Sequence, residues 1–173
     1  KEKWKDLLLE NNRRELVYCN FLSPEILKSM KEEVRNDDPE EYWAYIVHRS
    51  CANKVEAGDS WKVGCENLEV LDASGMSLLM AASSMNVEGL VAYLLRKGAQ
   101  VGAEGLDGRT PLIHASTRGH VRVCKTLIDF IAAEKRSEFV NAVSADGQTA
   151  LVSAAARGWL KVCRLLVGAG ASV

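Results

Sequence analysis

Histidine and cysteine are the first side chains to test for chemistry, because they can hold zinc or act as base and nucleophile. His48 and Cys51 lie three residues apart, and Cys19 and Cys65 could in principle supply further zinc ligands. No second paired motif accompanies them, and His48 and Cys51 are expected on one helix beside apolar residues. The sequence therefore predicts no metal site.

Nucleophilic catalysis finds no better support. Ser60 follows Gly58-Asp59 but lacks the Gly-x-Ser-x-Gly elbow, and its position after a predicted helix indicates a helix-ending turn. His114 and His120 have no acid or nucleophile at a suitable spacing. The glycines between Gly98 and Gly108 join a helix end to a turn, whereas a phosphate loop joins a strand to a helix. We therefore predict no catalytic residue and no cofactor in this chain.

Composition excludes two further classes of target. The 173 residues are 47% hydrophobic and 26% charged, with a net charge of −1, which is typical of a soluble globular protein. No apolar run approaches the roughly 18 residues that span a bilayer, so membrane insertion is not expected. Nucleic-acid binding is not expected either, because it needs a dense basic patch, usually with aromatic residues for stacking. Four basic residues are interpreted as a solvated helix face: Arg122, Lys125, Lys161 and Arg164.

The elements that must position any site repeat along the chain. Three similar segments begin two residues after a glycine: Ser77–Ala82, Thr110–Ala115 and Thr149–Ala154. Thr110 follows Ser77 by 33 residues, and Thr149 follows Thr110 by 39. Periods of this size are typical of repeat proteins, in which each unit buries its apolar face only against a neighbour.

The second half of each unit repeats as well. After Asn86, Gly119 and Gly158, apolar residues recur at offsets of about four, five, eight and nine. These offsets make one stripe along a helix, so one face of that helix is predicted to be core. Gly98 and Gly170 are placed to end two of these helices in the left-handed conformation. Each unit is therefore predicted to be a turn, a short helix, a tight turn and a longer helix.

Four motifs carry a resemblance to a known family: Asp72-x-x-Gly75-x-Ser77, Gly108-Arg109-Thr110-Pro111-Leu112, Arg118-Gly119-His120-Val121-x-Val123 and Leu165-Leu166-Val167-x-x-Gly170-Ala171. Together they resemble the ankyrin repeat family over roughly residues 67 to 173. The resemblance implies an all-α solenoid of helix-turn-helix repeats with β-turn fingers and a concave protein-binding groove, without catalytic residues. The expected units are about 67–102, 103–141 and 142–173.

Two departures from the family pattern lead to expectations of their own. Met80, Ile113 and Val152 stand where the family usually has histidine, so apolar packing should replace a polar contact. Ile131 stands where the middle unit would have its terminal glycine. The second helix of that unit is therefore expected to continue for a turn or more before a loop returns to Asn141.

Residues 1–66 show no repeat and are predicted to form an N-terminal helical region. The favoured role is a cap on the first repeat, and an independent helical domain is the alternative. At the other end, the stretch from Trp159 to Val167 is as apolar as its internal counterparts, although a terminal repeat needs a polar outer face. Further repeats, a capping helix or a partner are therefore expected beyond Val173.

The resemblance also implies where a partner would bind. The family's variable contact positions correspond here to Met76, Met85, Asp107, Arg109, Thr117, Arg118, Asp146, Gln148 and Arg157. We expect a scaffold or adaptor that binds a protein or peptide with an apolar anchor near the methionines and acidic groups near the arginines. The alternatives are that Arg118 and Arg157 are simply solvated, or that the chain is the regulatory or substrate-targeting part of a larger enzyme whose catalytic part lies elsewhere. The sequence predicts no oligomeric state.

The five cysteines bear on the compartment. Cys124 and Cys163 occupy equivalent positions in successive units, and stacked units lie about 10 Å apart, beyond the roughly 7 Å between Cα atoms that a disulfide allows. We therefore interpret them as small buried apolar residues. A reducing, intracellular location, cytoplasmic or nuclear, is the expectation.

Overall fold

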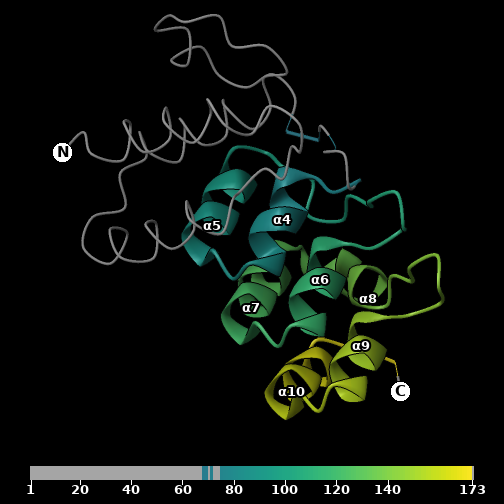
Figure 1. Cartoon of the computed structure of the whole chain (residues 1–173). Helices are drawn as coiled ribbons and strands as arrows, with labels where there is room; N and C mark the ends of the chain where they lie inside the picture. The colour runs from purple at the N-terminus through teal and green to yellow at the C-terminus, as the bar shows by residue number, and fades with distance from the viewer. Residues whose placement is uncertain (1–67, 70, 72–74, 173) are drawn as a thin grey trace, which may run out of the picture.

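The computed structural model describes residues 68–69, 71 and 75–172, and the expectations for residues 1–66 lie outside this part (Figure 1). The described residues form the helices α4 (Leu78–Ser84), α5 (Glu88–Arg96), α6 (Pro111–Thr117), α7 (Val121–Phe130), α8 (Ala133–Val140), α9 (Ala150–Ala156) and α10 (Leu160–Gly168). Three helical hairpins, α4–α5, α6–α7 and α9–α10, stack side by side. The short helices α4, α6 and α9 pack in one row, and α5, α7 and α10 pack in a second. The predicted all-α repeat architecture is confirmed.

Each short helix begins at a hydroxyl side chain that caps its free N–H groups. Ser77, Thr110 and Thr149 accept hydrogen bonds from the backbone N–H three residues later, at 3.4, 3.3 and 3.2 Å. In the first repeat, the Met80 sulfur also accepts from the backbone N–H of Ser77 at 3.4 Å. Met80 thus completes a capping box in which a thioether takes the usual place of a carboxylate.

The first and third long helices end as the glycines predicted. Gly98 and Gly170 have φ angles of 95° and 99°, a region that suits glycine. The backbone N–H groups of Ala99 and Ala171 reach back to Leu94 O and Leu166 O, both at 3.0 Å. These bonds satisfy carbonyls that the helix end would otherwise leave without a partner.

The expectation for the middle repeat was wrong. α7 ends at Phe130, because Ile131 is extended (φ −89°, ψ 135°) and its β-branched side chain disfavours the left-handed turn that glycine would allow. The inserted residues form a separate helix, α8, instead of a continuation of α7. Phe139 and Val140, at the end of α8, are buried against the core.

The core is a continuous seam that runs through all three hairpins. The equivalent pairs Leu90 and Leu94, Val123 and Leu127, and Val162 and Leu166 are all fully buried. The β-turn fingers are linked as well, because the N–H groups of Leu106 and Ala145 donate to Gly75 O and Asp107 O at 3.1 and 3.0 Å. The fingers and the helix stack are therefore held in one register.

Candidate functional site

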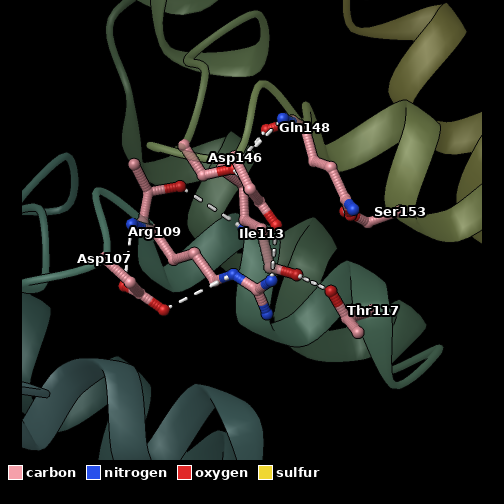
Figure 2. A network of polar contacts seen from close by, with 9 residues as sticks. Asp107, Arg109, Ile113, Thr117, Asp146, Gln148 and Ser153 are labelled. Carbon is pink, nitrogen blue, oxygen red and sulfur yellow. Dashed lines mark hydrogen bonds and ion pairs between the residues drawn. The ribbon is translucent and has the colours of Figure 1, made fainter.

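The residues predicted to contact a partner lie on the fingers and at the C-terminal ends of the short helices. Figure 2 shows the centre of this surface, where side chains of the second finger meet those of the third. The nine predicted residues fall into two groups. One group is engaged in contacts within the protein, and the other projects without such contacts.

Arg109 joins the second finger to the third. Its Nη2 lies 2.9 Å from Asp146 Oδ2, and its Nε lies 3.4 Å from Asp107 Oδ2. The backbone N–H of Arg109 also donates to Asp107 Oδ1 at 3.1 Å. The charge of Arg109 is thus balanced by two carboxylates (Figure 2). These three residues brace the fingers, which makes them poor candidates for capturing a partner's charge.

Asp146 is held by a second set of bonds. The Ser144 hydroxyl donates to the Asp146 carboxylate, and it accepts from the Gln148 N–H at 3.2 Å. These hydrogen bonds, first from Ser144 and then from Arg109, lower the pKa of Asp146. Gln148 is fixed in turn, because its Oε1 accepts from the Ser153 hydroxyl at 3.2 Å. The third finger is therefore ordered before any partner arrives.

Thr117 serves the packing of its own helix and of the next repeat. Its hydroxyl donates to Ile113 O at 2.7 Å, a local bond that occupies the side chain. Its carbonyl accepts from Trp159 Nε1 at 3.1 Å. One repeat earlier, His120 Nε2 lies 2.9 Å from Ser84 O, the equivalent carbonyl. Two different side chains therefore make the same contact between repeats, which the sequence alone did not indicate.

Arg118 and Arg157 form the second group. Each is the C-cap residue of its short helix, α6 and α9 respectively, and both side chains are exposed. Within the described residues neither arginine has a hydrogen bond or an ion pair. A cation at a helix C-terminus is favoured by the helix dipole. Met76 and Met85, the apolar members of the predicted set, are half-buried in the first repeat.

His114 belongs to this surface, although the sequence analysis considered it only for catalysis. It lies one turn before Arg118 on α6 and is buried, and its Nε2 has no hydrogen-bond partner among the described residues. Burial lowers the pKa of His114, Asp107 opposes that shift, and Arg109 and Arg118 add to it. The i, i+4 spacing to Arg118 was the signal that could have placed it here.

Other chemistry is not supported in the described part of the chain. Among these residues no group of three or more His, Cys, Asp or Glu side chains gathers as metal ligands would. Nor is any helix there long and apolar enough to cross a bilayer. Cys124 and Cys163 are free thiols; burial raises the pKa of Cys124 to about 11. What the arrangement offers is a rigid, polar concave surface with two exposed cations.

The comparisons with known proteins agree with this architecture. A family model for ankyrin repeats matches three copies, over residues 24–138 and 78–173. The chain belongs to the ankyrin repeat family. Ankyrin repeats generally mediate protein–protein interaction, and such domains are typically non-catalytic.

One curated relative is similar over part of this chain. Human M-phase phosphoprotein 8 is 31% identical over 101 residues, which make up 57% of this chain and 10% of the relative. The chain therefore matches about a tenth of the length of that protein.

Proposed function

We propose that this chain is a protein-interaction module that binds a peptide or protein surface in the groove between its fingers and the ends of its short helices. The observation that carries the proposal is the contrast between its arginines. Arg109 is neutralised within the fingers, whereas Arg118 and Arg157 are exposed at equivalent positions without a partner in the described part of the chain. Arginine binds carboxylates in bidentate geometry, so the partner should carry acidic groups.

The apolar part of the partner should meet the first repeat. Met76 and Met85 are half-buried there, and methionine adapts its shape to apolar surfaces. The bonds among Asp107, Arg109 and Asp146 order the fingers in advance. A preordered surface loses less conformational entropy on binding, so the same contacts give a tighter complex.

The form of this proposal that we favour is a scaffold or adaptor. A regulatory or substrate-targeting section of a larger enzyme would use the same groove, and it remains the alternative. We also propose an intracellular location, which the free thiols of Cys124 and Cys163 support, because a reducing compartment preserves thiols.

The test begins with affinity capture on the intact protein, followed by mass spectrometry to name a partner. Affinity for that partner is then measured with the double variant Arg118→Glu and Arg157→Glu. We expect binding to weaken by about tenfold or more, because two attractive contacts become repulsive. The matched control is Arg96→Glu with Lys125→Glu, which makes the same charge change at exposed positions of the long helices. Equal affinity of the groove variant and the control would refute the proposal.

A further inference from the structure

The third repeat leaves open the face that the middle repeat buries. Ile113 and Ile128 are 1% and 4% exposed, whereas their equivalents Val152 and Val167 are 52% and 50% exposed. Leu160, at the start of α10, is 70% exposed. We call Val152, Leu160 and Val167, with the neighbouring Lys161 and Arg164, the end face. Figure 1 shows α9 and α10 as the last layer of the helix stack.

The stack itself indicates the shape that the end face accepts. The surface of α6 and α7 receives the helices α9 and α10, and α9 and α10 repeat the same pattern of positions. Surfaces related by one repeat step have similar contours, because each repeat is the same supersecondary unit. The end face is therefore shaped to receive a helix. Contiguous exposed apolar side chains of this kind mark interaction sites in soluble proteins.

Charge narrows the choice of occupant. The stretch from Gly147 to Ser172 contains Arg157, Lys161 and Arg164 but no Asp or Glu. Lys161 and Arg164 are exposed and lie on α10 within one turn of Leu160 and Val167. The apolar side chains are thus bordered by cations only. A complementary surface would place carboxylates beside its apolar residues.

A second copy of this chain does not meet that requirement. Two end faces brought together would oppose cation to cation, which disfavours pairing. Head-to-tail stacking would need an open apolar face on the first repeat, yet Leu78, Leu90 and Tyr93 are at most 5% exposed. In the described part of the chain, none of the exposed large apolar side chains belongs to α4 or α5.

We propose that the end face binds an amphipathic helix of another protein, with leucine-like side chains on one stripe and Asp or Glu along its flanks. The apolar stripe covers Val152, Leu160 and Val167, and the carboxylates pair with Lys161 and Arg164. This mode is helix-in-groove recognition, in which apolar anchors at helical spacing supply most of the affinity. The end face is distinct from the finger groove, whose free cation on α6 is Arg118.

The proposal is tested with two labelled synthetic helical peptides that share one leucine stripe and carry either Glu or Lys on the flanks. Fluorescence anisotropy with the 173-residue chain should show saturable binding of the Glu peptide only. Leu160→Glu should weaken that binding by about tenfold or more, since it places a charge in the apolar centre. Lys161→Glu should weaken it by about threefold and reduce its salt dependence.

Two controls make the result specific. Val143→Glu changes an apolar side chain that is 56% exposed outside the end face, and Arg118→Glu changes the finger groove; both should leave Glu-peptide binding unchanged. Circular dichroism verifies that each variant is folded. Equal binding of the two peptides, no saturable binding of either, or indifference to Leu160→Glu would overturn the proposal. So would sedimentation that shows self-association abolished by Leu160→Glu, because a second copy would then be the occupant.

Discussion

The middle and the last repeat carry nearly the same pattern of residues but differ in burial. Ile113 and Ile128 of the middle repeat are buried, whereas Val152 and Val167 of the last repeat are half exposed. The helices begin in the same way, at Thr110 and Thr149, and their inner stripes are equally buried. The difference shows that in a stack an apolar residue is core only if the next repeat covers it.

The two junctions between repeats differ in a second way. His120 reaches back to Ser84 O at the first junction, and Trp159 reaches back to Thr117 O at the second. Both use a ring nitrogen at the same position before the long helix. The junction therefore requires a polar atom at one place, while the bulk of the ring is free to vary.

The largest effect should come from truncation of matched apolar residues. Ile113→Ala should lower the free energy of unfolding by about 3 to 4 kcal/mol, because it opens a cavity between α6 and its neighbours. Val152→Ala should cost less than about 1 kcal/mol, because the side chain is half exposed. Urea unfolding followed by circular dichroism measures both. Similar costs would mean that the end face is covered in solution.

A second pair of substitutions tests the junction itself. Gly119 and Gly158 have φ angles of 76° and 74°, so alanine is strained at both. A Cβ at Gly119 would lie 2.5 Å from the Trp159 ring, whereas a Cβ at Gly158 would meet nothing within 4 Å. Gly119→Ala should therefore cost about 2 to 3 kcal/mol, and Gly158→Ala about 1 kcal/mol.

The Trp159 ring should account for that difference. Adding Trp159→Ala to Gly119→Ala removes the clash, so the double variant should lose less free energy of unfolding than the sum of the two single variants. Thermal unfolding of the four proteins completes the cycle. Simple additivity would show that the clash is relieved in another way.

The smallest effect is a pH dependence confined to the middle repeat. The pKa of His114 lies below its ordinary value of 6.5, chiefly because the ring is buried, so the folded state binds a proton less readily than the unfolded chain. The stabilisation is complete above about pH 6.5 and decreases as the pH falls toward the folded pKa. Between pH 7.5 and pH 5.5 the Tm of the natural chain should fall more than that of His114→Gln. Serine at the equivalent position of the last repeat, Ser153, predicts no such term there. Parallel pH profiles of the two proteins would contradict the assignment.

Much of the fold could be predicted from local patterns. The period, the hydroxyl caps and the glycines at Gly98 and Gly170 act within a few residues of one another, so they indicated the helices and their ends. The insertion after Ile131 was harder. Its sequence is compatible with a longer α7, and only the packing of Phe139 and Val140 against the core favours a separate helix.

The surface was predicted less completely than the fold. The sequence placed Arg109, Arg118 and Arg157 together as candidate contacts, and all nine predicted contact residues remain untested by binding. What separates them is the position of Asp146, which comes from another repeat and takes up Arg109. His114 was missed as a groove residue because its burial and its neighbours come from other turns of the chain.

The sequence by itself determined the repeat, the helical hairpins and the membership in the ankyrin family, because helix caps, turns and apolar periodicity are short-range properties. Only the tertiary structure decided which arginine is exposed, which ring closes each junction and which apolar residues stay open at the end of the stack. Those outcomes depend on contacts between side chains that lie 30 or more residues apart, such as the 37 residues between Arg109 and Asp146. Such pairings follow from the stacking of whole repeats, which no single repeat encodes.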